Sequence, residues 1–315
     1  MRNELVSVII PSYNRADKIG TAIESVLQQD HKVIQLIVVD DGSVDDTEKV
    51  MSRFPQVQYI KKDHAGQAAA RNFGLQLCMG NFVATLDSDD AWKPAFVSSC
   101  LQKLENNRLD FVFTNWDQQL KDGGYFDFLS NDPFLKPYRQ HPVSGWFNLD
   151  NTQLRSLYLK ACPSPSSSAL MRRSSIHEGW NYQIKIGDDW GFYLDMILFK
   201  KCKAAFTLEK MWTKQINNSN IYDGRHWPEV LQNLYIHDVG CFMERYDSVL
   251  NRSESGLLQK KYIRALVELA NHRLFRGLDP KESFKLMKQS MSSAPLLTVV
   301  NIPKVLVNSF KNYIK

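Results

Sequence analysis

Short apolar runs alternate with amphipathic stretches along the first 115 residues. The stretch 16–28, for example, places Ile19, Ala22, Ile23, Val26 and Leu27 on one face of a helix. The expected strands are 5–10, 33–39, 57–60, 81–86 and 111–113, and the expected helices are 16–28, 44–54, 65–79 and 94–106. Because strands alternate with helices, we predict an α/β fold with a mostly parallel, Rossmann-like sheet covered by helices on both faces.

The pattern changes after residue 115. Glycines, prolines and aromatic residues mix between 117 and 150, which predicts an irregular excursion beside the sheet. A short apolar run at 169–171, an amphipathic helix at 187–199 and a strand at 204–212 follow, and the chain after 227 is predicted to be helical. We therefore expect three regions, namely an α/β half at 1–115, a second half at 116–226 and a helical region at 227–315.

The composition is that of an ordinary globular protein, with 43% hydrophobic and 23% charged residues among 315. Five cysteines, an odd number without any C-x-x-C spacing, argue against a disulfide framework and a structural zinc site. No apolar stretch approaches the roughly 18 residues that span a bilayer. These features predict a cytoplasmic protein.

The net charge of +5 is distributed unevenly. Residues 257–315 contain eleven Lys or Arg against three acids, which gives this region +8 and leaves about −3 for the rest. The final stretch "PLLTVVNIPKVLVNSFKNYIK" combines apolar residues with lysines. Such helices can lie on the inner face of the cytoplasmic membrane as a peripheral contact. A docking helix or an oligomer contact explains the same residues, and we favour the membrane slightly.

Two acidic clusters follow predicted strands. Asp40 and Asp41 end the strand at 33–39, and Asp87, Asp89 and Asp90 follow the strand at 81–86. Ligands of such sheets bind beyond the carboxyl ends of the strands, so both clusters should border one site. Asp87 and Asp89, two residues apart, point the same way and suit Mg²⁺ or Mn²⁺. The alternative for this cluster is a solvated turn in which Asp90 caps the next helix.

Two further features are ambiguous by themselves. Asp188 and Asp189 precede an amphipathic helix, where acids commonly cap the helix and complement its dipole, and spacing alone favours that role. Arg71 lies in the Ala-rich segment "HAGQAAARNFG", whose small residues permit close approach of backbone or ligand. The sequence contains neither a phosphate-binding ATPase loop nor a Gly-x-Gly-x-x-Gly fingerprint.

Five segments in order give these features a context: "SVIIPSYNR", "LIVVDDGSVDDT", "HAGQAAARNFGL", "FVATLDSDDAW" and "GDDWGFYLDM". Together they resemble the family 2 glycosyltransferases, inverting enzymes with the GT-A fold. The resemblance covers residues 5 to about 215. It implies a nucleotide-sugar donor, usually a UDP-sugar, bound by the half at 1–115, with the acceptor side and the catalytic base in 116–226. No nucleic-acid partner is expected.

The resemblance also implies roles for particular residues. Asp87-Ser88-Asp89 resembles the D-x-D motif of the family, with Asp89 as the ligand of Mn²⁺ or Mg²⁺. Asp189 corresponds to the general base, and Asp188 stands where the family usually has Glu. The implied donor-binding residues are Pro11, Tyr13, Arg15, Asp40, Asp41, Gly66, Arg71, Asp87 and Ser88.

The sequence departs from the family pattern in one loop. Family members often have a histidine after the base, where this chain has Gln215, and His226 follows eleven residues later as a candidate substitute. A Gln-x-x-Arg-Trp motif of processive synthases is absent, which favours transfer of a single sugar to a glycan or lipid-linked glycan. A nucleotidyltransferase and a non-catalytic sugar-nucleotide binder remain the alternatives.

Overall fold

The computed structural model describes residues 4–120, 123–215, 225–277 and 279–311, without the side chains of 215 and 304–311. The chain forms two compact units, which are described separately here. Unit 1 comprises residues 1–182 and 188–216, and unit 2 comprises residues 183–187 and 217–315. The predicted division into regions at 115/116 and 226/227 stays a prediction.

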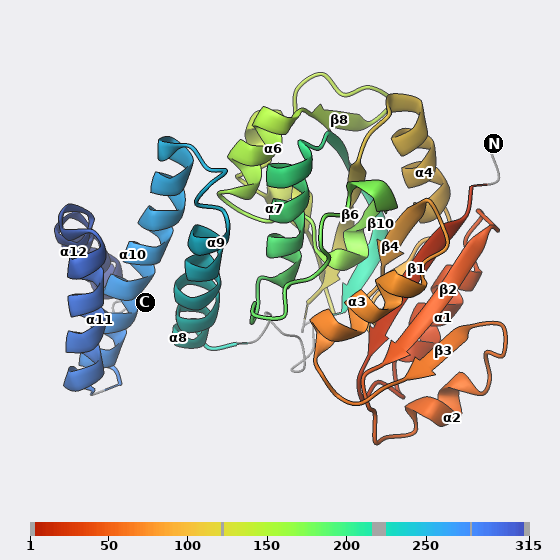
Figure 1. Ribbon diagram of the computed structural model, residues 1–315, viewed down its shortest axis with the longest axis horizontal. Helices are drawn as coiled ribbons and strands as arrows, with labels where there is room; N and C mark the ends of the chain where they lie inside the picture. Colours follow the sequence, from red (N-terminus) through yellow and green to blue (C-terminus); the bar gives the residue numbers. More distant parts are fainter. Residues whose placement is uncertain (1–3, 121–122, 216–224, 278, 312–315) are drawn as a thin grey trace. The chain divides into compact units, whose positions relative to one another are not determined.

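Unit 1 contains a ten-stranded sheet with helices packed against it (Figure 1). The strands are β1 Val6–Ser12, β2 Ile34–Asp40, β3 Gln58–Lys61, β4 Phe82–Thr85, β5 Ala91–Trp92, β6 Phe111–Gln119, β7 Tyr125–Asp127, β8 Trp146–Leu149, β9 Ala169–Arg172 and β10 Ala204–Gln215. The helices are α1 Ile19–Leu27, α2 Thr47–Met51, α3 Gln67–Leu77, α4 Phe96–Asn107, α5 Phe128–Asn131, α6 Asn151–Tyr158 and α7 Asp188–Lys200, with short 3₁₀ turns η1 Lys136–Tyr138, η2 Ser166–Ser168 and η3 Arg173–Ser175.

The sheet has the order β3-β2-β1-β4-β9-β6-β10-β5, with β7 and β8 added beside β6 and β10. Strands β1 to β4 pair in parallel, as the alternation of strands and helices predicts. The chain order reverses between β2 and β4 around β1, and ligand sites of such sheets lie at that position, beyond the carboxyl ends of the strands. The carboxyl ends of β1, β2 and β4 therefore frame the candidate site.

The second half of the sheet is mixed rather than parallel. Strand β9 runs antiparallel between β4 and β6, and β5, β7 and β8 also pair antiparallel with their neighbours. The region expected to be irregular contains β7, α5, η1 and β8, and β6 extends to Gln119 rather than ending at 113. Strand β7 pairs with β6 across a short connection, whereas β5, β8 and β9 pair with strands distant in sequence. Residues without a clear period therefore form these three strands through long-range pairing.

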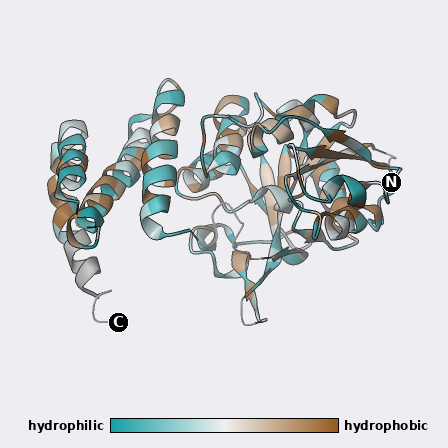
Figure 2. Ribbon diagram, turned by 90° about the horizontal axis from the view of Figure 1, so that it is seen from below, coloured by the Kyte–Doolittle hydropathy of each residue, from teal (hydrophilic) through white to brown (hydrophobic). Residues whose placement is uncertain are grey.

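Close packing of α3 on β1 depends on a glycine. All seven residues of β1 are buried, and Gly74 of α3 lies against Ile9, so that an added Cβ would be 2.5 Å from Ile9 Cγ2. The small residues of "HAGQAAARNFG" thus let the helix approach the strand. Figure 2 shows that hydrophobic and hydrophilic residues alternate in bands along the helices.

Unit 2 is helical, as predicted for the chain after 227. Its elements are α8 Trp227–Val230, the π-helix η4 Leu231–Asp238, α9 Val239–Arg245, α10 Arg252–Phe275, α11 Pro280–Ser293 and α12 Pro295–Lys311. A core of Leu231, Ile263, Leu266, Leu269 and Leu286 joins η4, α10 and α11. Among the described residues, no helix is both long enough and apolar enough to cross a bilayer.

The Gly74 contact predicts a change of stability with a definite sign. Gly74→Ala should destabilise unit 1 by about 1–3 kcal/mol through overpacking against Ile9, although Ala is the better helix former by about 1 kcal/mol. The control is Gly20→Ala in α1, where the nearest atom to the new Cβ is Val50 Cγ1 at 4.0 Å. In urea denaturation, the midpoint of unfolding should be lower for Gly74→Ala than for the wild type. For Gly20→Ala it should be equal to or higher than that of the wild type. Equal stabilisation by both changes would contradict this packing.

Candidate active site at the carboxyl ends of the parallel strands

The guanidinium group of Arg71 is the centre of the candidate site. Only 1% of this side chain is exposed, and it contacts three carboxylates. Arg71 Nη2 donates to Asp87 Oδ1 at 2.7 Å, and Nη1 donates to Asp188 Oδ2 at 2.6 Å and to Asp189 Oδ1 at 3.1 Å. The acids after β4 and at the start of α7, which are about a hundred residues apart in the sequence, therefore meet on one arginine of α3.

Local structure explains why these side chains converge. Asp87 follows the carboxyl end of β4, and α3 crosses the neighbouring strand β1 so that Arg71 points back toward that end. Asp188 and Asp189 form the first turn of α7, where carboxylates also complement the helix dipole. The ring of Trp180 lies 5.7 Å from Arg71 Cζ and covers one side of the guanidinium group.

A serine-rich segment, the 3₁₀ turn η2, connects Asp189 with Asp87 and Asp90. Ser166 donates to Asp189 through its amide, at 2.8 Å to Oδ2, and through its hydroxyl group to Oδ1. The Ser167 hydroxyl accepts from the Asp87 amide at 3.0 Å and donates to Asp90 Oδ2 at 2.6 Å. Asp90 is thus buried against Ser167 and does not cap α4, contrary to the alternative drawn from the sequence.

Sequence reasoning missed this role of the serines. Ser166 and Ser167 belong to the stretch "SPSSS" and hold the carboxylates in place. Trp180 was not singled out at all, and its Nε1 lies 3.5 Å from Asp189 Oδ1. The only available signal was that three consecutive small polar residues precede a strand, which by itself is typical of a turn.

The site has an excess of negative charge, because three carboxylates contact one arginine. Burial disfavours the charged form of Arg71, but the carboxylates of Asp189, Asp87 and Asp188 outweigh that effect and raise its pKa. Burial raises the pKa of Asp188 to about 7, with repulsion from Asp189 and Asp87 adding to the shift and Arg71 opposing it. Burial also raises the pKa of Asp87 and, more strongly, that of Asp90.

A second acidic centre lies at the end of β2. Asp41 is buried and accepts from Lys62 Nζ at 2.6 Å, from the Ala65 amide at 3.0 Å and from the Gly66 amide at 2.7 Å. His64 Nδ1 lies 2.9 Å from the same carboxylate, and the imidazole stacks on the half-exposed ring of Tyr13. The loop before α3 therefore wraps around Asp41.

Asp40 has different surroundings from Asp41. It is fully buried and accepts from the Ser43 amide at 2.8 Å and from the Tyr59 hydroxyl at 2.6 Å. These partners belong to the turn after β2 and to β3, so Asp40 stabilises the position of Asp41. In the same region the Arg15 amide donates to Thr47 Oγ1, and Pro11 is a buried residue of β1.

The first residues of α3 connect the two acidic centres. The Gly66 amide binds Asp41, and the next side chain, Gln67, donates to Asp87 Oδ1 at 3.3 Å. Gly66 has a φ of 93° with open space around its Cβ position, so the chain turns there without a side chain in the way. Hydrogen bonds thus connect Asp41, Asp87 and Asp189 in one site. The strand-end argument predicts this for Asp41 and Asp87, and it does not cover Asp189.

Residues 7–180, more than half of the chain, match the family model described as Glycosyl transferase family 2. The chain belongs to this glycosyl transferase family 2. The family resemblance predicted from the five sequence segments is therefore confirmed.

Individual relatives agree with this assignment. One is the UDP-Glc:alpha-D-GlcNAc-diphosphoundecaprenol beta-1,3-glucosyltransferase WfaP of Escherichia coli, 37% identical over 116 residues, which cover 36% of this chain and 46% of WfaP. The chain spans only 20 to 53% of the length of the curated relatives that it matches.

Solved structures show the same fold. S. aureus TarS 1–349 in complex with UDP-GlcNAc superposes with a TM-score of 0.65 at 14% identity, over 98% of this chain and 92% of that one. The mannosyltransferase PcManGT from Pyrobaculum calidifontis, in complex with GDP-Man and Mn²⁺, gives 0.54 at 16% identity, over 98% and 82%. The predicted GT-A type fold is confirmed.

The segment Asp87-Ser88-Asp89 offers oxygen ligands for a divalent cation. Asp89 is half-buried, Ser88 between the two acids is buried, and Asp87 already binds Arg71. Within the described residues, no three His, Cys, Asp or Glu side chains form a ready-made metal cage. This donor set fits Mg²⁺ or Mn²⁺ in the form in which one or two carboxylates and substrate phosphates share the ion.

Two residues were considered in place of the family histidine, Gln215 and His226. Gln215 is the last residue of β10, paired with Gln119, and its side chain lies outside the described residues. His226 is exposed before α8 in unit 2. Both assignments stay predictions.

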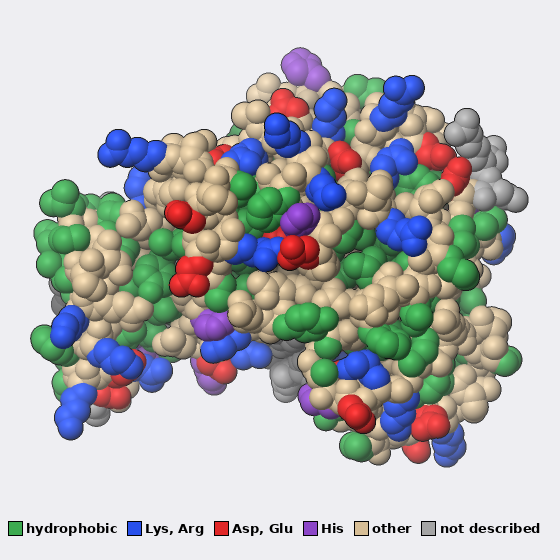
Figure 3. Space-filling view, in the orientation of Figure 1, with side chains coloured by type: hydrophobic (Ala, Val, Ile, Leu, Met, Phe, Trp, Pro, Cys, Tyr) green, Lys and Arg blue, Asp and Glu red, His purple; other side chains and the backbone are tan. Residues whose placement is uncertain are grey.

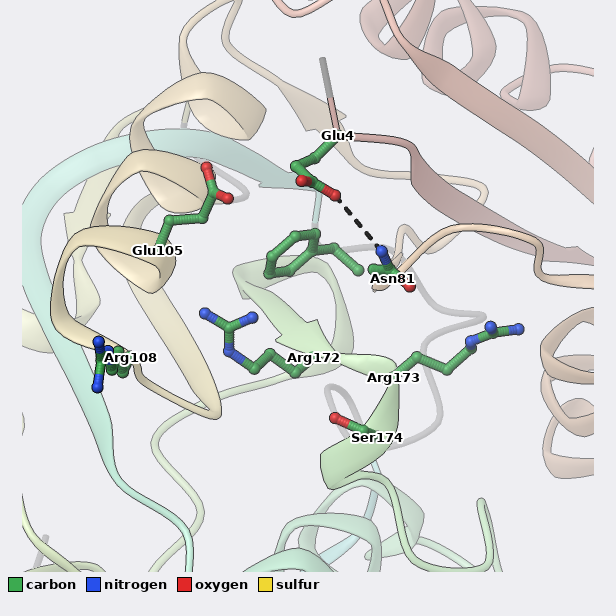
Figure 4. A pocket seen from close by; sticks show the side chains of 8 residues that line it. Glu4, Asn81, Glu105, Arg108, Arg172, Arg173 and Ser174 are labelled. Carbon is green, nitrogen blue, oxygen red and sulfur yellow. Dashed lines mark hydrogen bonds between the residues drawn. The ribbon is translucent and has the colours of Figure 1, made fainter. Parts of the chain in front are cut away.

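A separate cavity of about 640 Å³ lies at the opposite end of the sheet, lined by residues that include Glu4, Glu105, Arg108 and Arg172. It lies at the amino end of β4, whereas Asp87 follows the carboxyl end. In Figure 4, Glu4 is bonded to Asn81, and Arg173 extends away from Arg172. Two acids, Glu4 and Glu105, lie on one side of the cavity in this view, and three arginines, Arg108, Arg172 and Arg173, lie on the other.

The raised pKa of Asp188 predicts a pH-dependent stability. The pKa of Asp188 in the folded protein, about 7, lies above the ordinary aspartate pKa of 3.8. The contribution of this carboxyl to stability is therefore complete below about pH 4 and is lost as the pH rises through about 7. As the pH rises from about 5 to 7.5, the free energy of unfolding of Asp188→Asn should therefore increase by about 1–3 kcal/mol relative to that of the wild type. Denaturation at several pH values measures this difference. The exposed Asp63→Asn serves as control, and a pH-independent difference for Asp188→Asn would refute the assignment.

Proposed function

We propose that this protein is an inverting, metal-assisted glycosyltransferase that moves one sugar from a UDP-sugar to a hydroxyl group of a glycan or lipid-linked glycan. The observation that carries this proposal is the convergence of Asp87, Asp188 and Asp189 on Arg71. The segments that we assign to the donor and to the base are distant in sequence, and these ion pairs support their placement at the same site.

The nucleotide is proposed to bind between the Asp41 loop and the start of α3. Asp41 can accept from a base N–H once the donors that it now binds rearrange, and the exposed ring of Tyr13 offers a face for stacking. Arg15, Pro11 and Asp40 shape this end of the site. UDP is favoured because WfaP is named for UDP-Glc and the TarS complex contains UDP-GlcNAc.

Asp89, with Asp87 and Ser88 beside it, is proposed to hold Mn²⁺ or Mg²⁺ on the diphosphate of the donor. The PcManGT complex contains Mn²⁺, which supports a divalent cation for this fold. Such an ion supplies Lewis-acid stabilisation of the negative charge on the leaving diphosphate. Arg71, fixed between the acids, adds a permanent positive charge in the same region.

Asp189 is proposed as the general base, acting through Oδ2. Oδ1 already accepts from Arg71, Ser166 and Trp180, whereas Oδ2 accepts only from the Ser166 amide among the described residues. Oδ2 can therefore take the proton of the acceptor hydroxyl while that oxygen bonds to the anomeric carbon. The bond from this carbon to the diphosphate oxygen breaks on the opposite face, which inverts the configuration. Asp188 positions Arg71.

The acceptor is proposed to be a lipid-linked glycan, since WfaP is named for a diphosphoundecaprenol-linked GlcNAc. Such an acceptor would bring the protein to the inner face of the cytoplasmic membrane as a peripheral protein. Oligomer formation is the other arrangement that its exposed apolar residues would fit.

A donor assay tests the base. With a panel of UDP-, GDP- and dTDP-sugars and Mn²⁺, the protein should slowly release UDP from one UDP-sugar. Asp189→Asn should lower this rate by about 10²–10⁴-fold, because it keeps the shape of the side chain and removes the proton acceptor. The exposed Asp46→Asn is the matched control and should retain the wild-type rate. Release of pyrophosphate would indicate a nucleotidyltransferase, and binding without turnover in the presence of acceptors would indicate a sugar-nucleotide binder.

A metal titration tests Asp89 separately. Asp89→Ala should abolish the stimulation of UDP release by Mn²⁺ and raise the Mn²⁺ concentration for half-maximal UDP binding at least about tenfold, because the proposed ligand carboxylate is lost. Isothermal titration with UDP, with and without Mn²⁺, gives this value without turnover. An unchanged Mn²⁺ requirement would rule out Asp89 as the ligand.

A further inference from the structure

Over residues 295–303, where the structure describes its side chains, helix α12 of unit 2 directs several apolar side chains outward. Leu296, Val299 and Val300 are 84%, 56% and 53% exposed, and Pro303 is exposed as well. Their spacing of i, i+3, i+4 and i+7 makes one continuous helix face. Surface helices of globular proteins normally direct such a face toward the core.

This orientation is held by specific contacts on the inner side. Ser290 Oγ of α11 and Thr298 Oγ1 of α12 are fully buried and share a hydrogen bond of 2.7 Å. Leu297, next to Thr298, packs against the unit 2 core. Because Thr298 and Leu297 face inward, the rotation of α12 is set, and Leu296, Val299 and Val300 must face outward.

The neighbouring helix α11 supplies positive charge on its own outward face. Lys281, Lys285 and Lys288 are exposed at helical spacing, and Phe284 between them is 72% exposed. On the opposite side of α11, Leu286 belongs to the core. Figure 3 shows hydrophobic and Lys or Arg side chains mixed over the part of unit 2 that contains α11 and α12.

The charge of the surrounding segment favours one kind of partner. Residues 257–315 contain eleven Lys or Arg and three acids. Exposed apolar side chains beside lysines match the chemistry of an anionic bilayer, where the apolar groups enter the acyl boundary and the lysines meet the phosphates. A second copy of the same face would instead bring like charges together.

We propose that the outward faces of α11 and α12 bind the surface of an anionic lipid bilayer. The contact is peripheral, formed by Phe284, Leu296, Val299 and Val300 with the three lysines of α11. It deepens the proposed function, on which it rests only for the identity of the lipid-linked acceptor. The surface itself lies in unit 2 and contains no residue assigned to donor binding or catalysis.

Vesicle sedimentation with the full chain tests this contact. The protein should bind vesicles of equal parts phosphatidylglycerol and phosphatidylcholine at least tenfold more tightly than pure phosphatidylcholine, and the difference should shrink as salt is added. Replacing Leu296, Val299 and Val300 with Ser should lower the affinity for anionic vesicles at least tenfold. The matched control replaces the equally exposed Val44, Met79 and Val143 of unit 1 with Ser and should bind like the wild type.

A charge-matched pair of variants separates lysine position from net charge. Lys281→Gln, Lys285→Gln and Lys288→Gln together should weaken binding at least tenfold, whereas Lys49→Gln, Lys136→Gln and Lys203→Gln, exposed in unit 1, should weaken it far less. Equal losses, or equal binding to neutral and anionic vesicles, would overturn the proposal. So would a dimer in light scattering that dissociates in the Leu296, Val299 and Val300 variant.

The donor assay keeps this proposal distinct from the proposed function. UDP release without lipid should be unchanged in all variants of α11 and α12, and unchanged thermal midpoints show that they fold. Vesicle binding without UDP release would remove the proposed function and leave the membrane contact. UDP release without vesicle binding would do the reverse.

Discussion

The structure of the site depends on one buried charge. Arg71 is almost completely shielded from water, and a guanidinium group in that position is tolerated only when carboxylates surround it. Its partners are Asp87 after β4 and Asp188 and Asp189 at the start of α7, so the ion cluster ties the parallel half of the sheet to a segment more than a hundred residues later. Loss of the arginine would leave three partly buried acids without a counter-charge, and loss of the acids would leave a buried arginine without one.

The same cluster leaves a surplus of negative charge. An arginine cannot lose or gain charge at ordinary pH, so further neutralisation must come from protons or from another cation. Burial and mutual repulsion raise the pKa of Asp188, Asp87 and Asp90, which favours binding of protons by these carboxylates. A divalent ion that arrives with a diphosphate would neutralise the remaining negative charge. This charge surplus is the physical support for the proposed metal-assisted transfer.

The sequence predicted the parts of this site that follow from local pattern. Alternating strands and helices located β1 to β4, and the strand-end rule brought Asp41 and Asp87 to one edge of the sheet. It did not predict the burial of Arg71, because an arginine on an Ala-rich helix is usually a surface residue. Nor did it predict β9 or the hydrogen bonds of Ser166, since both depend on partners distant in sequence and neither has a period.

Unit 2 illustrates a limit of another kind. The spacing of apolar residues in α12 identifies an amphipathic helix but does not say which side packs inward. That choice is made by a buried hydroxyl pair, Ser290 and Thr298, and by Leu297 against the core. Helix α12 thus has a polar contact on its inner side and apolar side chains on its outer side, the reverse of an ordinary surface helix. Removal of Leu296, Val299 and Val300 from water by a partner would therefore contribute favourably to the free energy of binding. Exposed apolar side chains on α12 therefore lie beside the lysines of α11. An anionic bilayer is the partner that can bury the apolar side chains and pair with the lysines.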